Sequence, residues 1–393
     1  MTSTVYIAKN IYGGDGLGRL GDGRVVFVPN AWAGEQVKAE IVEEHKHFVR
    51  ARLVEVVERS PDRIEGGAFA AVPGCVYANL SEEAELRTKG GQLADFLSRA
   101  RLTCGEAKLV ATGGFRNKVV YHFAKQGGKW VIGYRQEPSH ELVDVVVDPL
   151  AAGEINAKLP EIRKNVLMLL TTGPEAVRRE VERKGRVTIR WTKKSGVKWW
   201  LGDSADGIVL RETTLGLDFD VPAEGFYQVN PIVGEELVRS VVEAYRTGAA
   251  GAETVLDLYC GVGVFGLCCR PPRLIGVESG RLAVDFARQN AASLKQSDAR
   301  FFAEQVGRNM RRMPLGAHTT VIVDPPRGGL EPGVARTLAQ SRVPRILCIS
   351  CDPATLVRDL RELCSTYEIE SVKWFNMFPR TARFETFVTL RRR

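Results

Sequence analysis

Hydrophobic and polar positions follow three different patterns along the chain. From residue 1 to about 60, short β-branched runs (VYIAKNIY, GRVVFVPN, EQVKAEIVEE and FVRARLVEVV) are separated by Gly- and Asp-rich segments such as GGDGLGRLGDG and NAWAGE. Runs of this kind between turn-forming segments are typical of small all-β folds. We therefore predict an OB-like barrel over residues 1–60.

The second stretch begins where Pro61 and Gly66-Gly67 interrupt the strand pattern. Residues 81–100 (SEEAELRTKGGQLADFLSRA) are predicted to be helical, with Ser81 as N-cap and with Glu83 and Glu85 in the first turns. From Phe115 to Phe219 the pattern is strand-rich again, with two hairpin-like pairs, KVVYHFAKQGGKWVIGYR and RVTIRWTKKSGVKWWLG. This predicts a β-rich central domain over residues 61–225.

In the third stretch, short buried strands alternate with helices. The apolar runs TVLDLY, RLIGVE, TVIVD and RILCIS are spaced by helical patterns such as EELVRSVVEAYR and GRLAVDFARQNAASL. Such alternation predicts an α/β fold with a doubly wound, Rossmann-like parallel sheet, here over residues 226–393.

Composition restricts the class of protein. A chain of 393 residues is too long for one ordinary core, and 44% hydrophobic with 26% charged residues is typical of soluble globular proteins. No apolar run is long enough to span a bilayer, and MTSTVYIAKN lacks the form of a signal peptide, so we expect a cytoplasmic protein without a membrane partner. The eight cysteines are scattered and include a single C-x-x-C, which favours reduced thiols and no metal site.

A net charge of +8 moderately favours a polyanionic partner. In the barrel, basic residues that suit RNA binding, or that simply keep an exposed barrel soluble, are Lys9, Arg19, Arg24, Lys46, Arg50 and Arg52. The second hairpin pair mixes basic residues with tryptophans, which suits phosphate contact and base stacking and equally suits cross-strand packing: Arg186, Arg190, Lys193, Lys194 and Lys198 with Trp191, Trp199 and Trp200.

A glycine-rich turn follows the first strand of the parallel sheet. Gly261, Gly263 and Gly266 match G-x-G-x-x-G, and Glu278 ends the next strand where a ribose-binding acid belongs. Asp257, at the mouth of this turn, would repel a pyrophosphate but would help to hold an ammonium group. The pattern therefore favours S-adenosylmethionine, which has an amino group, a sulfonium and a ribose diol, over a dinucleotide.

The next two strand ends carry an acid and a thiol. Asp324 begins DPPRGGL, where two prolines stiffen a loop that can hold a flat base beside a cofactor. Cys351 follows the run that contains Cys348 and precedes Asp352-Pro353. We interpret Cys348 as a buried structural cysteine, whereas the position of Cys351 at a strand-to-helix junction favours chemistry over packing.

The motifs DLYCGVGVFGL, DPPRGGL, ISCDPATLVRDL and FPRTARFET, preceded by GFRNKV and GFYQVN, resemble those of the RNA uracil-5-methyltransferase family, including its ribosomal RNA and transfer RNA branches. The resemblance covers nearly the whole chain. It implies an N-terminal TRAM barrel, a central β-rich domain and a C-terminal S-adenosylmethionine-dependent methyltransferase domain, with the helix near residues 81–105 packing on that last domain.

The resemblance also implies roles for individual residues. Carbon 5 of uracil is a weak nucleophile, so Cys351 would add to carbon 6 and Glu385 would later remove the carbon-5 proton. Without the resemblance, Glu385 is better explained as a salt-bridged surface acid among Arg380, Arg383 and the final arginines. The implied cofactor-binding residues are Gln228, Tyr259, Gly261, Gly263, Glu278, Asp324 and, toward the adenine, Gln305.

Three positions depart from the family pattern. Many ribosomal members hold an iron-sulfur cluster with four cysteines, whereas this chain keeps only Cys75, so no cluster is expected. Arg383 stands where a histidine is usual, and Val264 where a polar residue is common.

The sequence leaves the RNA target open between ribosomal RNA, which we favour, and transfer RNA, and we expect a monomer. Two other functions remain as alternatives. One is a dinucleotide-dependent oxidoreductase, and the other is an RNA-binding assembly factor that has lost catalysis.

Overall fold

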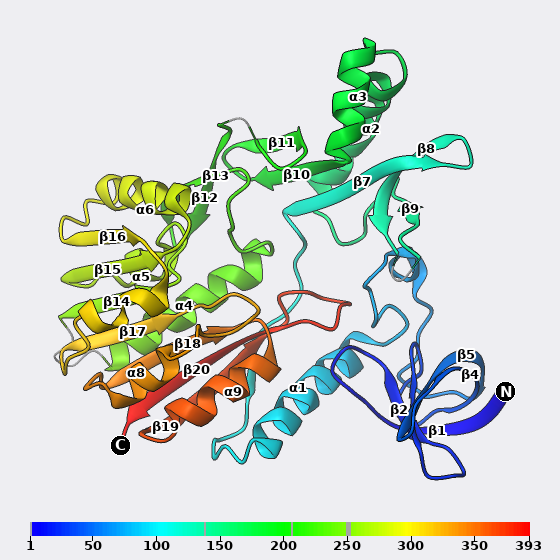
Figure 1. The fold of residues 1–393 in the computed structure, drawn as a ribbon, viewed down its shortest axis with the longest axis horizontal. Helices are drawn as coiled ribbons and strands as arrows, with labels where there is room; N and C mark the ends of the chain where they lie inside the picture. The colour runs from blue at the N-terminus through cyan, green and yellow to red at the C-terminus, as the bar shows by residue number, and fades with distance from the viewer. Residues whose placement is uncertain (1, 137–138, 206, 249–252) are drawn as a thin grey trace.

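The computed structural model describes residues 2–136, 139–205, 207–248 and 253–393. It consists of an N-terminal barrel, a central sheet with two helices, and a large C-terminal α/β unit (Figure 1). The strands are β1 (Thr2–Asn10), β2 (Gly16–Arg19), β3 (Val25–Val28), β4 (Gln36–Glu44), β5 (Phe48–Glu58), β6 (Lys108–Ala111), β7 (Lys118–Gln126), β8 (Lys129–Arg135), β9 (Leu142–Asp144), β10 (Arg186–Thr192), β11 (Gly196–Leu201), β12 (Val209–Thr214), β13 (Leu217–Pro222), β14 (Thr254–Leu258), β15 (Arg273–Glu278), β16 (Ala299–Ala303), β17 (Thr319–Val323), β18 (Arg345–Ser350), β19 (Tyr367–Phe375) and β20 (Glu385–Arg392). The helices are α1 (Glu82–Arg99), α2 (Gly153–Thr171), α3 (Glu175–Lys184), α4 (Pro231–Gly248), α5 (Val264–Cys269), α6 (Arg281–Ser293), α7 (Val306–Asn309), α8 (Val334–Gln340) and α9 (Pro353–Leu363), with 3-10 turns at Gly67–Ala71 and Met310–Arg312.

The N-terminal barrel closes in the order β1-β2-β3-β5-β4. Strand β2 lies inside GGDGLGRLGDG, which the sequence analysis treated as a turn. Its glycines are required by the closed barrel, because a Cβ on Gly16 would lie 2.6 Å from the Ala31 carbonyl oxygen and one on Gly18 would lie 2.4 Å from Val5. The glycine content that suggested a turn therefore reflects close packing of a strand.

The central unit is a sheet in the order β11-β10-β7-β8-β9, and it contains both predicted hairpins. It also contains α2 and α3, which the prediction of a strand-rich region missed. Apolar residues of α2 at helical spacing (Ile155, Leu159, Ile162, Val166 and Leu170) are buried against the sheet. The periodicity for this helix was present in the sequence.

The C-terminal unit is built on a sheet in the order β16-β15-β14-β17-β18-β20-β19-β6. Its first five strands are parallel, and β20 runs antiparallel to β18 and β19. Alternate residues of the buried strands face two separate apolar clusters: Val255 and Leu347 pack with α4, α5 and α6, while Leu256 and Ile346 pack with α8 and α9. This is the predicted doubly wound arrangement.

Two segments from before the central unit also belong to this fold. Helix α1 starts after Ser81, whose hydroxyl accepts the Ala84 N–H as predicted. It buries Leu93 and Leu97 in the same cluster as Leu360 of α9. Strand β6 pairs with β19 and forms one edge of the eight-stranded C-terminal sheet, which carries the candidate site described below and is called the catalytic sheet from there on.

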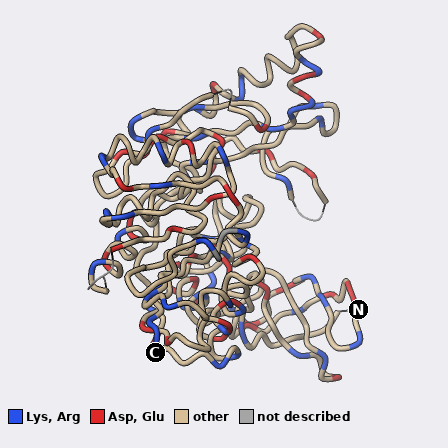
Figure 2. Tube along the Cα trace, turned by 60° about the vertical axis from the view of Figure 1, so that its left-hand side comes forward, with Lys and Arg blue, Asp and Glu red and all other residues tan. Residues whose placement is uncertain are grey.

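Among the described residues, no helix combines the length and apolar content needed to cross a bilayer. Charges of both signs are distributed over all three units (Figure 2).

Candidate active site

Cys351 lies at the carboxyl end of the parallel sheet, between β18 and α9. Asp352 caps α9 by accepting the N–H groups of Ala354 (2.9 Å) and Thr355 (3.3 Å), and Pro353 occupies the first helical turn. The capped turn leaves Cys351 half-buried, whereas Cys348, three residues earlier, is only 2% exposed. Of the two cysteines, Cys351 is the one that a substrate can reach.

Glu385 is brought to the same place by strand pairing. In the antiparallel pair of β18 and β20, Ser350 lies opposite Thr386, so extending this register by one residue brings Cys351 opposite Glu385. Glu385 is only 6% exposed. Its alternative interpretation as a salt-bridged surface acid is therefore wrong.

The site combines a thiol, two carboxyl groups and two arginines in a poorly hydrated environment. Burial, followed by the charges of Glu385 and Asp324, raises the pKa of the Cys351 thiol to about 11, against the opposing charge of Arg327. Burial, followed by the charge of Asp324, raises the pKa of Glu385 well above its usual range, against Arg327 and Arg383. Burial also raises the pKa of Asp324 to about 7. Such perturbed groups in one place are characteristic of functional sites.

A tyrosine from the barrel also reaches this site. The Tyr12 hydroxyl donates to Asp352 Oδ2 at 3.5 Å, and its ring packs edge-on against Phe384 with centroids 6.0 Å apart. Burial raises the pKa of Tyr12 to about 12, which keeps it a neutral donor. Arg383 approaches the same carboxylate oxygen at 3.8 Å. Sequence reasoning did not find Tyr12, because its partner is 340 positions away.

Beside these groups is a cavity at the carboxyl ends of β14 and β17. Four of the predicted cofactor-binding residues line it: Gln228, Tyr259, Gly261 and Asp324. Tyr259 has a left-handed backbone (φ 64°), and its hydroxyl accepts the Glu331 N–H at 3.1 Å. That bond fixes the tyrosine ring at the cavity wall.

The wall opposite the glycine-rich turn comes from residues around the β12–β13 hairpin, which the sequence analysis did not single out. Thr213, Thr214 and Phe226 line the cavity, and Phe226 is 70% exposed. The Thr214 hydroxyl is paired with the Tyr227 hydroxyl at 2.5 Å. An exposed phenylalanine at a cavity rim is a signal that only the structure provides, because Phe226 stands in the sequence as one of many aromatics.

Glu278, predicted to bind the ribose, closes the glycine-rich turn and is not among the residues lining the cavity. Its carboxylate accepts the N–H groups of Gly261 (3.3 Å) and Gly280 (2.7 Å). Gly261 and Gly263 have φ values of 53° and 88°, which favour glycine. Gly263 caps α5 but is not among the residues lining the cavity.

Two interpretations of this region need correction. Asp257 is fully buried, and its Oδ2 accepts the Gly266 N–H at 2.9 Å, so it braces the turn from beneath instead of facing an ammonium group in the cavity. Gln305 stands exposed at the start of α7 and does not line the cavity.

The cysteine left from the family's cluster is packed as an apolar side chain. Cys75 is buried with Val72, Ala78 and Leu150, and burial raises the pKa of its thiol to about 11. Within the described ranges, no group of three or more His, Cys, Asp or Glu side chains could hold a metal ion. These surroundings do not fit an iron-sulfur cluster.

The predicted basic residues differ in how available they are. Arg190 is 1% exposed and pairs with Glu212 at 2.9 Å, so its suggested role in phosphate contact is wrong. In the barrel, Lys9, Arg24, Arg50 and Arg52 all pair with acids. Lys193 and Lys198 are exposed and form no ion pair with the part of the chain that the structure describes.

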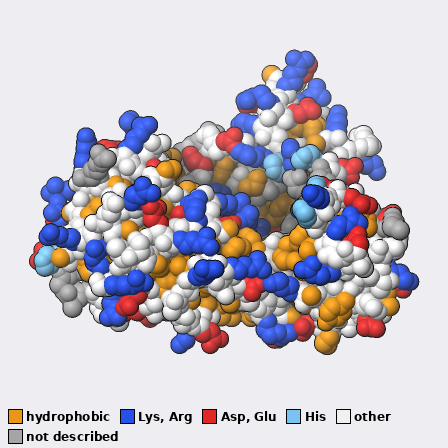
Figure 3. Space-filling model, turned by 60° about the horizontal axis from the view of Figure 1, so that its bottom comes forward, with side chains coloured by type: hydrophobic (Ala, Val, Ile, Leu, Met, Phe, Trp, Pro, Cys, Tyr) orange, Lys and Arg blue, Asp and Glu red, His pale blue; other side chains and the backbone are white. Residues whose placement is uncertain are grey.

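The molecular surface is hollowed on one face. Figure 3 shows a recess with hydrophobic side chains at its base, and with Lys, Arg and His side chains, interspersed with some Asp and Glu, around its rim. A concave, positively charged and partly apolar surface is suited to a nucleic acid.

Comparisons with known proteins identify the family. The family model described as tRNA (Uracil-5-)-methyltransferase matches residues 214–393, and the TRAM domain model matches residues 2–54. A protein of Thermotoga maritima named as an uncharacterized RNA methyltransferase is 31% identical over 99% of each chain. The chain belongs to the RNA (uracil-5-)-methyltransferase family. Membership excludes the oxidoreductase alternative and confirms the predicted fold class, with its TRAM barrel and methyltransferase unit.

Two further members of the RNA (uracil-5-)-methyltransferase family are similar over nearly the whole chain. One, from Chromohalobacter salexigens, is named 23S rRNA (uracil(1939)-C(5))-methyltransferase and is 29% identical over 98% of this chain and 88% of its own length. The crystal structure of Pyrococcus abyssi tRNA (uracil-54, C5)-methyltransferase in complex with S-adenosyl-L-homocysteine has a TM-score of 0.74 at 23% identity, covering 98% of this chain and all of that one. The second likeness shows the fold.

Proposed function

We propose that this protein methylates carbon 5 of a uridine in RNA through a covalent adduct between Cys351 and carbon 6, with Glu385 as the base. The observation that carries the proposal is that Cys351 and Glu385 adjoin the paired residues Ser350 and Thr386, where the charge of Glu385 raises the Cys351 pKa, next to the cavity lined by Asp324. Family membership supplies the reaction class, and the position of Cys351 and Glu385 beside the cavity supports their assignment as the two groups that this reaction requires.

The reaction begins with the Cys351 thiolate adding to carbon 6 of uracil, which breaks the 5,6 double bond and places electron density on carbon 5. Arg327 favours the thiolate, because it lowers a pKa that burial has raised. Carbon 5 then takes the methyl group. Glu385 removes the remaining carbon-5 proton, the double bond re-forms, and the thiolate leaves. A carboxylate whose pKa is raised by burial is a strong enough base for this step.

S-adenosylmethionine supplies the methyl group from its sulfonium, and the cavity has the composition to hold it. Apolar Val262 and Phe265 stand beside the polar groups of Gln228 and Asp324. A mixture of hydrophobic walls and a few convergent polar groups suits a molecule with both apolar and charged parts. We assign ribose binding to Glu278, because its carboxylate bonds to Gly261, which lines the cavity.

We further propose a target in 23S ribosomal RNA. The support is the greater sequence identity to a relative named for that substrate, 29%, than to the transfer RNA enzyme of known structure, 23%. We place the protein in the cytoplasm as a monomer bound to RNA. Mass-spectrometric mapping of 5-methyluridine in a strain lacking the protein tests the target: a loss confined to transfer RNA would overturn the ribosomal assignment.

The covalent mechanism is tested by comparing two variants. Cys351→Ala should bind RNA and cofactor but form no adduct, whereas Glu385→Gln should add and methylate and then remain attached to RNA. Denaturing gels should therefore show a slow-migrating protein–RNA band for Glu385→Gln only. RNA with 5-fluorouridine should trap the unmutated enzyme, because fluorine cannot be removed as a proton.

Absence of that trapped band in the unmutated enzyme, with RNA binding retained, would favour the RNA-binding factor without catalysis. A band from Cys351→Ala would assign the nucleophile to another thiol.

A further inference from the structure

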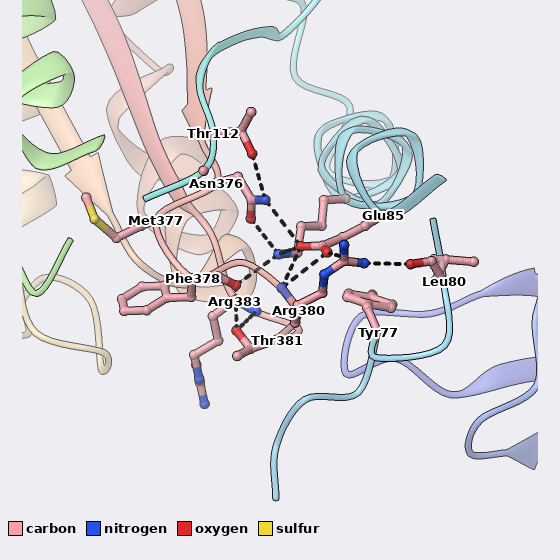
Figure 4. Close-up of polar contacts among 12 residues, drawn as sticks. Tyr77, Leu80, Glu85, Thr112, Asn376, Met377, Phe378, Arg380, Thr381 and Arg383 are labelled. Carbon is pink, nitrogen blue, oxygen red and sulfur yellow. Dashed lines mark hydrogen bonds and ion pairs between the residues drawn. The ribbon is translucent and has the colours of Figure 1, made fainter. Parts of the chain in front are cut away.

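The loop that leads into Glu385 is held by helix α1, which lies almost 300 positions earlier in the chain than this loop. Residues 376–384, called here the base loop, connect β19 to β20, and Phe375 pairs with Glu385 across its ends. The loop therefore determines where Glu385 starts its strand. Figure 4 shows Glu85 of α1 pointing toward this loop, and Lys89 of the same helix is bonded to the loop residues Asn376 and Phe378.

A buried ammonium group fixes the beginning of the base loop. Lys89 Nζ donates to Glu85 Oε1 (2.7 Å), to Asn376 Oδ1 (2.6 Å) and to the Phe378 carbonyl (3.2 Å), so all three of its donors are used. The residues Glu85, Lys89 and Asn376 are each 0% exposed. Polar groups so far from water adopt one geometry, since any displacement leaves a charge without a partner.

A carboxylate fixes the turn of the loop. The Arg380 N–H donates to both Glu85 oxygens, at 3.0 and 3.1 Å, and Asn376 Nδ2 donates to Oε1 at 3.2 Å. Arg380 has a left-handed backbone with φ of 66°, a conformation that costs a non-glycine residue about 1–3 kcal/mol. Glu85 stabilises this conformation by accepting the N–H at the strained residue.

Residues 77–80, which precede α1, also hold Arg380. Together with Glu85 and Lys89 they are called here the clamp. The Arg380 guanidinium donates to the Leu80 carbonyl at 2.6 Å, and its own carbonyl accepts the Tyr77 N–H at 3.0 Å. Beyond this turn, the Arg383 N–H donates to the Thr381 hydroxyl at 3.3 Å. The chain is thus fixed from Asn376 to Arg383, two residues before the base.

We infer that Glu85 and Lys89 are positioning residues for the proton-removal step, acting through the base loop on Glu385. This inference rests on the proposed function, because it assigns the pair to the second half of the covalent reaction. Cys351 belongs to a different connection, between β18 and α9, which neither residue contacts. Loss of the clamp should therefore slow the release of methylated RNA and leave adduct formation nearly unchanged.

The test is a Glu85→Leu/Lys89→Met double variant, which removes both buried charges while keeping apolar volume and leaves the Arg380 N–H without its acceptor. A matched control is Glu35→Leu/Arg63→Met in the barrel. Glu35 is fully buried, whereas the side chain of Arg63, which stands five residues after β5, is 10% exposed. The Nε–Oε1 distance is 2.6 Å, and neither side chain bonds to the base loop. Thermal unfolding of both variants reports the loss of stability common to any buried ion pair.

Two RNAs then separate the steps. With 5-fluorouridine RNA, the double variant should form its adduct at within about twofold of the unmutated rate. With ordinary RNA, its release of product should be slowed tenfold or more, so that a denaturation-stable complex accumulates in which the pyrimidine carries the methyl group. The barrel control should accumulate none.

Equal slowing of adduct formation and release, or release at the unmutated rate, would overturn the positioning role. Failure of the proposed function is distinguishable, because the unmutated enzyme would then form no adduct with 5-fluorouridine RNA. If the double variant does not fold, Glu85→Gln takes its place. It keeps one acceptor for the Arg380 N–H and should show the same selective slowing of release, by at least threefold.

Discussion

The charge environment of Cys351 predicts an unusual reactivity toward alkylating reagents. Its thiol pKa of about 11 compares with a normal value of 9.0. At pH 8 this higher pKa lowers the thiolate fraction about a hundredfold. A more basic thiolate is a stronger nucleophile, and this raises the reactivity of each thiolate about tenfold. In the free enzyme, Cys351 should therefore react with iodoacetamide about ten times more slowly than an unperturbed cysteine, with a rate that still rises up to pH 11.

Two substitutions should shift the pH dependence of Cys351 alkylation in opposite directions. Glu385→Gln removes a carboxylate that raises the Cys351 pKa, so alkylation should reach half its maximum at a lower pH. Arg327→Gln removes a cation that lowers the pKa, so the midpoint should rise. Cys364 is an internal control, since its pKa is raised by burial and affected by Arg393 and Cys104, and not by these groups.

The assay is alkylation over a series of pH values, followed by peptide mass spectrometry that quantifies each cysteine separately. Equal displacement of Cys351 and Cys364 would show that the variants act by loosening the fold. Cys351 midpoints that stay fixed in both variants would refute the argument that Glu385 and Arg327 face the thiol.

Three further outcomes are expected. Deleting residues 1–60 should weaken RNA binding and flatten its salt dependence while leaving cofactor binding intact. The slope of log binding constant against log salt concentration should fall in magnitude by no more than about 2, because four of the six basic residues named in the barrel are already paired with acids. Binding measured from 50 to 200 mM salt checks this, and an unchanged slope counts against the barrel as an RNA module. The purified protein should be colourless even when prepared without oxygen, as Cys75 is packed among apolar side chains, and stoichiometric iron and sulfide would contradict this. Leu93→Ala on α1 should lower the free energy of unfolding by about 2–5 kcal/mol in a denaturant titration, because Leu93 is fully buried against the catalytic sheet. A loss below about 1 kcal/mol would show that the helix packs loosely.

The parts of the fold that could be predicted from sequence are those with a local signal. Alternation of strands and helices identified β14, β15, β17 and β18, and Ser81 marked the start of α1, because each depends on neighbouring residues. The same dependence explains the errors. Gly16 and Gly18 looked like turn residues, since their close approach to Ala31 and Val5 exists only in the closed barrel.

Within the site, motif residues at strand ends were predictable, but their contacts were not. Tyr259, Gly261 and Asp324 line the cavity as expected. Asp257 does not, because alternation along β14 turns its side chain beneath the glycine-rich turn, where it accepts the Gly266 N–H. The contributions of Tyr12 and Lys89 come from residues hundreds of positions from their partners, and no pattern in one sequence reveals such pairs.

The placement of β6 at the edge of the catalytic sheet affects how the chain acquires its structure during synthesis. Residues 108–111 leave the ribosome long before β19, the strand with which they pair. Until residue 375 has been made, the edge of β6 and the apolar side of α1 lack partners that they have in the folded protein. During this time both can associate incorrectly with other parts of the nascent chain or with other chains. A gene fragment encoding residues 226–393 alone would lack both elements. It would expose the β19 edge and the face covered by Leu93 and Leu97, and it should therefore aggregate where the full-length chain does not.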